Sequence, residues 1–418
     1  MSIATDVSHR CSRTGVQVLQ HGLRLAAGPI GVCRTSALLL RGWPSVMGWL
    51  AGWLSAEFPP HVLTGHALSG LGPLPVARVA AGWAGQRADQ ILTAALEEGL
   101  GPTYRDMVCH PLGDHHGCAR RDGLLHMAGH RRRYAAQTSD IGYGPEGRDN
   151  SLDIWRHPGQ RGAPAPVLIQ VPGGGWSING KRGQAYPLMS RMVELGWICV
   201  SIDYRKSPRH AWPAHIIDVK RAIAWVRDNI ADYGGDPDFV AITGGSAGAH
   251  LASLAALTAG DPRFQPGFEA ADTAVQAAVP FYGVYDLTNA TSMHAMMLPF
   301  LEYVVMQKGY ADNPELFASA SPISHAHCAS PPFFILHGQN DAVIPSAQAQ
   351  AFCAALRRAG ASTVCYAELP NAHHAFDTVA TVRSRLTADA VAEFLGVAYG
   401  RYVRSRAGWL PTRISPAS

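Results

Sequence analysis

A serine between small residues is the first feature of this sequence that could do chemistry. Ser246 stands at the centre of Gly244-Gly245-Ser246-Ala247-Gly248, which matches the pattern G-x-S-x-G. The strand-like run FVAIT leads directly into it and the helix-like run AHLASLAALT leads directly out. A sharp strand–turn–helix connection exposes the serine hydroxyl, and Gly244 and Gly248 leave room for so tight a turn. The context predicts that Ser246 is a nucleophile.

An acid and a base follow Ser246 in the chain. Asp341 comes shortly after the apolar run FFIL, and His373 and His374 follow the next strand-like segment. A neutral imidazole can take the proton of a serine, and a carboxylate can hold that imidazole in the correct tautomer. The chain order Ser246, Asp341, histidine is the order expected of this motif. Asp286 is a rival acid, and because neighbouring loop side chains usually point apart, only one of the two histidines should meet the serine.

Glycines upstream of the serine could stabilise a negatively charged oxygen. Pro-Gly-Gly-Gly-Trp at 172–176 follows the strand-like run VLIQV. Backbone amides can approach an oxyanion only where side chains do not block them. We expect Gly174 and Gly175 to be the preferred donors, with Gly173 as a further candidate and the amide of Ala247 completing the oxyanion hole.

The elements around these motifs alternate between strand and helix from residue 140 onward. Strands are expected at 150–155, 166–171, 197–203, 239–243, 274–282, 333–336 and 363–368. Helices are expected at 87–100, 186–195, 216–233, 247–258 and 347–359. This alternation predicts an α/β fold with a mostly parallel central sheet and helices on both faces.

The length of the chain bears on its domain organisation, and its net charge bears on whether it binds a nucleic acid. The chain has 418 residues and a net charge of +4, and so small a surplus gives no reason to expect a nucleic acid. We predict a mainly helical N-terminal extension over 1–135, a catalytic domain over 136–400 and a C-terminal tail over 401–418.

The segment 28–56 is apolar but interrupted by Arg34 and Arg41. It carries Trp43, Trp49 and Trp53, which favour a membrane–water interface. Packing on the core is the competing interpretation, and a spanning helix is disfavoured by the short uncharged run. The segment predicts peripheral membrane contact. The expected location is the membrane or cell envelope, or otherwise the cytoplasm, and the oligomeric state stays open.

The chain resembles the hormone-sensitive-lipase-like carboxylesterase/lipase branch of the α/β-hydrolase fold, notably mycobacterial lipase-type esterases with an N-terminal extension. The resemblance covers roughly residues 135–400 and rests on LDIWRHP, VPGGGW, SIDYRKSP, YGGDPDFVAITGGSAGAH, VPFYGVYDL, FFILHGQNDAVIP and HHAFD. It implies a carboxylic ester hydrolase without a cofactor, acting on a small acyl ester or a lipid. It also selects His374 over His373. Two residues depart from the pattern, because Pro172 replaces a common His and Gly245 a common Asp or Glu.

Other interpretations compete with the esterase. The same triad could serve an amidase, a formamidase or a thioesterase, and a non-catalytic binding protein would also have this scaffold. Histidines and cysteines cluster within ten residues but lack a zinc-binding spacing, so we predict no metal site there; they are Cys109, His110, His115, His116 and Cys118. A Met-rich stretch after Asp286 is interpreted as an acyl-binding cap, with ordinary core packing as the alternative.

Overall fold

The computed structural model describes residues 75–112, 124–135, 138–159, 164–291, 293 and 295–406. An eight-stranded sheet lies at its centre, in the order β1-β2-β4-β3-β5-β6-β7-β8. The strands are β1 (Ile141–Gly142), β2 (Ser151–Trp155), β3 (Ala165–Val171), β4 (Ile198–Ile202), β5 (Gly235–Gly245), β6 (Ala277–Phe281), β7 (Phe333–Gly338) and β8 (Val364–Leu369). The pairings β1–β2 and β2–β4 are antiparallel and the others parallel. This confirms the predicted α/β-hydrolase architecture.

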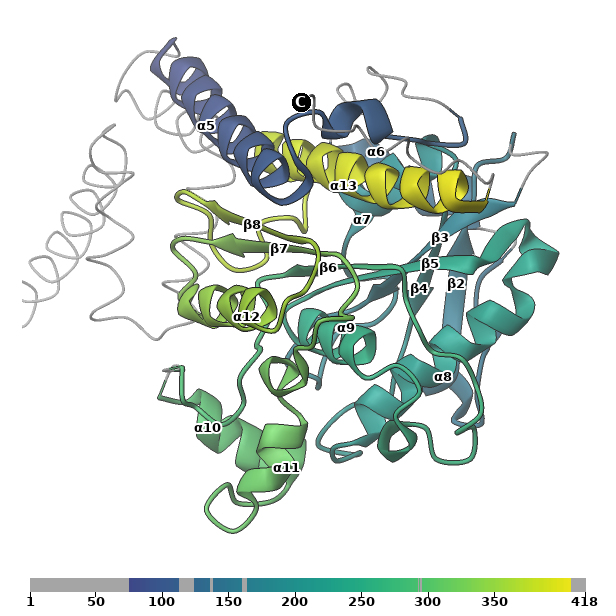
Figure 1. Cartoon of the computed structure of the whole chain (residues 1–418), viewed down its shortest axis with the longest axis vertical. Coiled ribbons are helices and arrows are strands. Elements are labelled where there is room, and N and C mark those ends of the chain that lie inside the picture. Colours follow the sequence, from purple (N-terminus) through teal and green to yellow (C-terminus); the bar gives the residue numbers. More distant parts are fainter. Residues whose placement is uncertain are drawn as a thin grey trace, which may run out of the picture.

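Helices cover both faces of the sheet (Figure 1). On one face lie α5 (Pro75–Leu100), α6 (Leu124–Ala135), α7 (Tyr186–Glu194) and α13 (Val382–Arg406). On the other face lie α8 (Ala214–Asn229), α9 (Ala247–Leu257) and α12 (Ala347–Arg358). Each face has its own apolar core. The central strands are buried on both sides, which explains why β3, with the sequence APVLIQV, is apolar nearly throughout.

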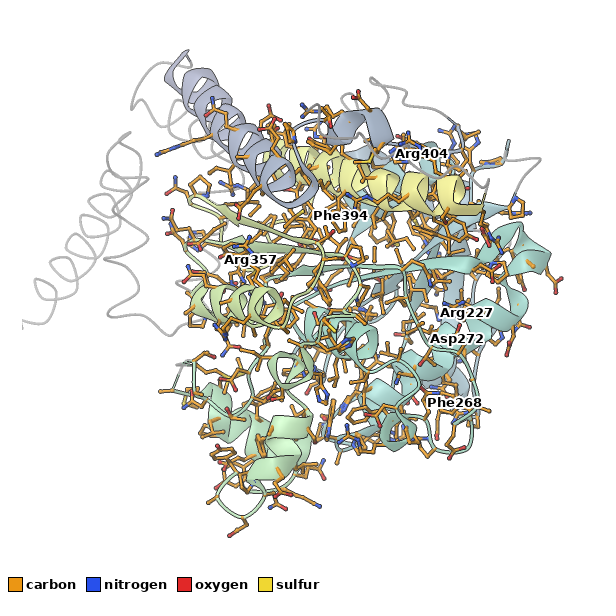
Figure 2. All side chains as sticks on the ribbon, viewed as in Figure 1. Arg227, Phe268, Asp272, Arg357, Phe394 and Arg404 are labelled. Carbon is orange, nitrogen blue, oxygen red and sulfur yellow. The ribbon has the colours of Figure 1, made fainter. Side chains whose placement is uncertain are left out.

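The long helix α13 was not among the expected elements. It continues to Arg406, past residue 400, where the sequence placed the start of a tail. Phe394 points from α13 toward the sheet and packs against Phe334 with ring centroids 5.5 Å apart (Figure 2). Near the helix end, Tyr402 packs on Phe239 and donates a hydrogen bond to Asp236. These contacts hold the last turns of α13 on the α/β domain.

Part of the predicted N-terminal extension lies directly on the α/β domain. The helix α5 begins at Pro75 rather than at the expected Arg87, and it packs against α13 and β8. Its apolar side, which includes Leu92 and Leu96, is buried in the same core as α7 and α13. The segment 28–56 lies outside the described residues. None of the helices in the described part of the chain is long and apolar enough to cross a bilayer.

Candidate active site

The sequence around Ser246 forms the sharp turn that the motif predicts. Ser246 lies between the end of β5 and the start of α9, with φ of 58° and ψ of −121°. This left-handed φ is uncommon for a residue with a side chain. A Cβ on Gly248 would lie 2.1 Å from the Val171 carbonyl oxygen, and one on Gly244 would lie 2.6 Å from the Gly248 backbone. The turn therefore requires both glycines, and it presents the hydroxyl at the carboxyl edge of the sheet.

Three side chains from separate loops meet at this turn in one hydrogen-bonded line. His374 Nδ1 lies 2.7 Å from Asp341 Oδ2, and His374 Nε2 lies 2.9 Å from Ser246 Oγ. Because an ionised carboxylate only accepts, Nδ1 carries the hydrogen and Nε2 is left to accept from the serine hydroxyl. In this arrangement the imidazole can take a proton from Ser246 without changing its tautomer.

The surroundings of Asp341 keep its carboxyl ionised. Its Oδ1 accepts hydrogen bonds from the amides of Val343 and Ile344, at 2.9 and 2.8 Å. Its Oδ2 faces His337 Nε2 at 3.4 Å as well as His374. Burial alone would raise the pKa of Asp341, but the facing His374 and the hydrogen bonds from His337 and His374 hold that pKa well below its ordinary value. Asp341 therefore remains an acceptor across the working pH range.

The rival residues have other partners. Both carboxyl oxygens of Asp286 accept hydrogen bonds from Thr288 and Thr291, from backbone and hydroxyl alike. The structure thus joins Asp341, and not Asp286, to the histidine. His373 is buried, and burial, assisted by nearby Arg383, lowers the pKa of its imidazole. Of the two adjacent histidines, His374 is the one that hydrogen-bonds Ser246.

The hydrogen bonds of the glycine loop after β3 distinguish among the candidate oxyanion donors. The Gly173 amide donates to Gln184 Oε1 at 2.7 Å, so this expected candidate is already engaged within the protein. Gly174 and Gly175 have φ of +110° and +58°, values that suit glycine. No acceptor in the described part of the chain takes the amide hydrogens of Gly174, Gly175 or Ala247. Ala247 is also the first residue of α9, where the helix dipole favours a negative charge.

Buried polar side chains that the sequence did not single out hold this loop in place. Trp176 Nε1 donates to His250 Nδ1 at 3.2 Å, and His250 Nε2 donates to the Ala320 carbonyl at 2.7 Å. Burial lowers the pKa of His250 to about 4, so it is neutral and can accept from Trp176. Tyr204 donates its hydroxyl hydrogen to the Pro172 carbonyl at 2.9 Å. Pro172, which departs from the family pattern, is therefore supported through its backbone.

A short helical segment lies beside the glycine loop after β3. The helix α10 (Met297–Phe300) continues into a π-helical turn, Leu301–Met306. A Cβ on Gly175 would lie 3.4 Å from the ring of Phe300. Met297, Leu298 and Phe300 are half-buried against the core. The Met-rich stretch thus brings an apolar ring next to a candidate oxyanion donor.

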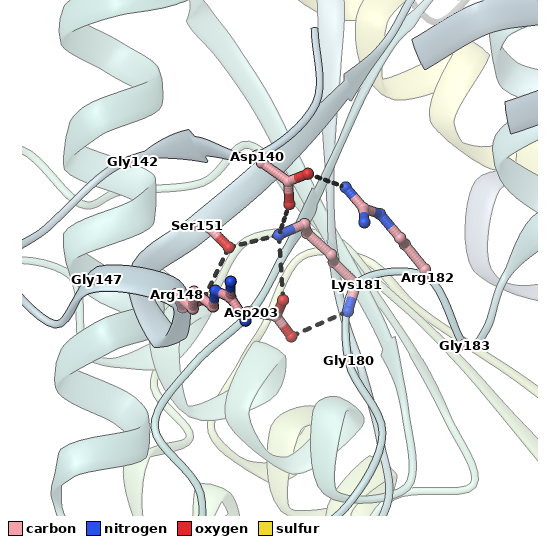
Figure 3. Close-up of a pocket in the computed structure, with 10 residues that line it drawn as sticks. All are labelled: Asp140, Gly142, Gly147, Arg148, Ser151, Gly180, Lys181, Arg182, Gly183 and Asp203. Atoms are coloured by element: carbon pink, nitrogen blue, oxygen red, sulfur yellow. Dashed lines mark hydrogen bonds and ion pairs between the residues drawn. The ribbon is translucent and has the colours of Figure 1, made fainter. Parts of the chain in front are cut away.

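A polar cavity of about 910 Å³ opens beside the outgoing end of the same loop (Figure 3). The buried Lys181 ammonium pairs there with Asp140 at 2.9 Å and with Asp203 at 3.3 Å. Arg182 pairs with Asp140 and with the buried Asp153, at 2.6 and 2.7 Å. The triad residues do not line this cavity. Its charges largely neutralise one another, and they join the end of the glycine loop to the strands at one edge of the sheet.

In the described part of the chain, no group of three or more potential metal ligands comes together. His110 Nδ1 instead accepts a hydrogen bond from Trp197 Nε1 at 3.1 Å. His115, His116 and Cys118 lie outside the described residues.

Comparison with known proteins gives the same fold and a related chemistry. The family model BD-FAE matches residues 152–356. Esterase LipQ of Mycobacterium tuberculosis is 66% identical over 422 residues, which cover 100% of both chains. The carboxylic ester hydrolase LipM of the same organism, described as probable, is 49% identical over 87% of this chain and 89% of its own. Among solved structures, a truncated carbohydrate esterase from gut microbiota is 25% identical, with a TM-score of 0.54, over 63% of this chain and 97% of its own.

The eight-stranded sheet, the serine turn and the full-length similarity to LipQ lead to one assignment. This chain belongs to the α/β-hydrolase family of carboxylic ester hydrolases that includes the mycobacterial esterases LipQ and LipM.

Proposed function

We propose that the chain hydrolyses acyl esters through a covalent acyl-enzyme on Ser246. The Ser246 hydroxyl loses its proton to His374 Nε2 and attacks the ester carbonyl carbon, while Asp341 stabilises the imidazolium. The carbonyl oxygen becomes an oxyanion, which accepts hydrogen bonds from the amides of Gly174, Gly175 and Ala247. His374 then returns the proton to the departing alcohol.

Deacylation repeats these steps with water as the nucleophile. His374 Nε2 takes a proton from the water, which attacks the acyl carbon, and the same amides stabilise the second oxyanion. Collapse of this intermediate returns the proton to Ser246 Oγ and releases the carboxylic acid. The observation that supports the proposal most is the line of two hydrogen bonds, 2.7 and 2.9 Å long, that ends on Ser246.

Replacement of Ser246 by alanine tests the proposal. We expect Ser246→Ala to lower kcat for a p-nitrophenyl ester by at least about 10⁴-fold and to abolish labelling by a fluorophosphonate. The matched control is Ser253→Ala, which removes another buried hydroxyl from the same helix α9. A folded Ser246→Ala protein with near-wild-type turnover would refute the nucleophile assignment.

The bond cleaved is tested by paired substrates. The relatives LipQ and LipM are named as ester hydrolases, so we expect the p-nitrophenyl ester to be turned over much faster than the matching anilide. A higher kcat/KM for the anilide would point to an amidase with the same triad.

The acyl group is proposed to be of short to medium length and to lie against the cap formed by residues 297–306. The support is the half-buried, apolar ring of Phe300 next to Gly175, because apolar surface favours an acyl chain over a charged group. We expect kcat/KM across p-nitrophenyl esters to peak at short or medium chains. Phe300→Ala should move the peak to longer chains, whereas Tyr303→Ala should not, since that side chain is 80% exposed. A wild-type peak on long chains would contradict the proposal.

Peripheral membrane contact through residues 28–56 is proposed from their sequence. The tryptophans and neighbouring arginines of this segment suit a membrane–water interface. The full chain should therefore sediment with vesicles that contain anionic lipid, and a variant with Trp43, Trp49 and Trp53 replaced by serine should sediment less. Equal recovery of the two proteins in the supernatant would refute the contact.

A further inference from the structure

A tyrosine and an aspartate that lie next to the triad have no part in the chemistry described above. Tyr282 follows β6 directly, is 1% exposed, and has a positive φ of 40°. Its ring centroid lies 4.7 Å from that of the His374 imidazole, with the planes inclined at 58°. It also packs edge-on against Phe376, at 5.5 Å. The tyrosine therefore lies against one side of the histidine whose two nitrogens reach Asp341 and Ser246.

The hydroxyl of Tyr282 fixes the loop that carries His374. It donates a hydrogen bond to Asp377 Oδ1, and Asp377 follows His374 by three residues on the same loop. The space for this hydroxyl depends on Gly245, because a Cβ there would lie 2.7 Å from the Tyr282 oxygen. The glycine before the nucleophile, the aromatic ring and the carboxylate thus form one contact set around the imidazole.

The chemistry of this contact set suits the step in which His374 becomes charged. A tyrosine hydroxyl that donates to a carboxylate favours its charged form, and a negative charge near an imidazolium stabilises it. Burial raises the pKa of Asp377 overall, and the hydrogen bond from Tyr282 and the nearby His374 offset part of that rise. The edge and face of a tyrosine ring also restrict the tilt of the imidazole, which must point at both Ser246 and Asp341.

We propose that Tyr282 and Asp377 are positioning residues for the esterase reaction, which hold the His374 imidazole in its reactive orientation and add a second negative charge beside it. The proposal rests on the proposed function, since it requires His374 to act as the base.

Two conservative variants keep the Tyr282 ring and test the hydroxyl and the carboxylate charge separately. Tyr282→Phe keeps the ring and removes the hydroxyl, and Asp377→Asn keeps the shape and removes the charge. Each should lower kcat for a p-nitrophenyl ester about tenfold while KM changes less than about twofold, because the lost interaction belongs to the transition state. The double variant should lose less than the product of the two single losses, since both changes fall on the same hydroxyl–carboxylate pair. Tyr285→Phe is the control, because Tyr285 is equally buried but stacks on Phe352, at 4.5 Å, rather than on His374.

The pH profile distinguishes positioning at the base from simple loop stabilisation. The groups beside His374 or its acid include Ser246, Tyr282, His337, Asp341, His373 and Asp377, and Arg383 lies near His373. Removing the negative charge of Asp377 disfavours the imidazolium, so the acid limb of kcat/KM should move to lower pH by roughly half a unit. Loss of loop stability alone would lower the melting temperature and leave this limb in place.

The outcomes decide between the two roles. A tenfold lower kcat in both variants, with an acid limb displaced downward in Asp377→Asn and a normal Tyr285→Phe, supports the proposal. Variants that fold and keep kcat within twofold of wild type would overturn it, as would an unmoved acid limb. Should Ser246→Ala or His374→Ala stay active, the proposed function itself fails. Should those two be inactive while Tyr282→Phe and Asp377→Asn match wild type, only the positioning role fails.

Discussion

Replacing Asp341 by asparagine removes one charge and leaves nearly the same shape. The asparagine carbonyl oxygen can still accept from the amides of Val343 and Ile344, which now hold Oδ1. The position of Oδ2 then carries an amide group, 2.7 Å from His374 Nδ1 if the geometry is kept. An amide donates, so Nδ1 becomes an acceptor and the hydrogen moves to Nε2. The tautomer that faces Ser246 can no longer accept its proton.

The size of the effect follows from the charge that is lost. At an effective dielectric constant of about 20, two unit charges roughly 4 Å apart attract by about 4 kcal/mol. At about 1.4 kcal/mol for each factor of ten, this lowers the rate about 10³-fold, and the wrong tautomer adds to the loss. We therefore expect Asp341→Asn to lower kcat by about 10³- to 10⁴-fold. KM should change little, because Asp341 contacts His374 and not the ester.

The assay is steady-state hydrolysis of a p-nitrophenyl ester, with thermal unfolding measured on the same samples. Asp286→Asn is the comparison, because Asp286 is a buried carboxyl that hydrogen-bonds Thr288 and Thr291 instead of a histidine. It should lower the melting temperature and spare most of kcat. A folded Asp341→Asn enzyme that kept a tenth of its kcat would refute the reasoning, and the reverse ranking of the two variants would move the acid role to Asp286.

Three further outcomes are expected. His374→Ala should lose several orders of magnitude in kcat and His373→Ala far less, because of the two histidines it is His374 that hydrogen-bonds Ser246. Steady-state kinetics of the two single variants check this. An inactive His373→Ala beside an active His374→Ala would reverse the assignment. Gly248→Ala should lower the free energy of unfolding by about 3 kcal/mol, since its Cβ would lie 2.1 Å from the Val171 carbonyl oxygen. The control is Gly129→Ala, which adds a Cβ in open space and should leave the stability nearly unchanged. Chemical denaturation of both variants tests the steric argument. Burial lowers the pKa of His250 to about 4, below its ordinary 6.5. Between these two values the unfolded chain binds more protons than the folded one, so the free energy of unfolding should fall by up to about 3 kcal/mol as pH drops from 6.5 to 4. The His250→Gln variant should show a smaller fall on acidification, and a fall equal to that of the wild type would contradict the assignment to His250.

The meeting of Ser246, Asp341 and His374 could be predicted because each residue stands in a local pattern that determines its place in the fold. Ser246 needs a strand before it and a helix after it, and Asp341 and His374 follow strands whose carboxyl ends meet at one edge of a parallel sheet. The spacing alone left His373 and His374 open, since both follow the same strand. The backbone of the loop decides between them by directing one imidazole toward Ser246.

The helix α13 shows what local patterns miss. Gly396 and Gly400 weaken its sequence as a helix, because glycine lowers helix propensity. In the fold these positions lie against another segment of chain. A Cβ on Gly400 would lie 2.1 Å from the Met107 carbonyl oxygen, and one on Gly396 would lie 2.8 Å from His110. Tertiary packing thus favours the same glycines that make the helix hard to recognise.

The Gly173 amide illustrates a second limit on what the sequence can predict. The sequence left Gly173 as a further candidate donor, and only the fold shows that Gln184, eleven residues later, accepts from its amide. The residues that support the loop, such as Tyr204 and His250, are buried and are distributed among strand and helix patterns. Their hydrogen bonds join different elements, so the spacing of residues along the chain does not predict them.

The glycine loop after β3 is supported by contacts at its beginning, middle and end. Tyr204 holds the carbonyl of Pro172, and His250 holds the ring of Trp176. At the end, Lys181 pairs with Asp140 and Asp203 at the edge of the sheet. A buried charge without its partner is strongly unfavourable, so these pairs restrict where the loop can lie. The ion pairs of Lys181 thereby add to the contacts that position the glycine loop, which carries the proposed oxyanion donors Gly174 and Gly175.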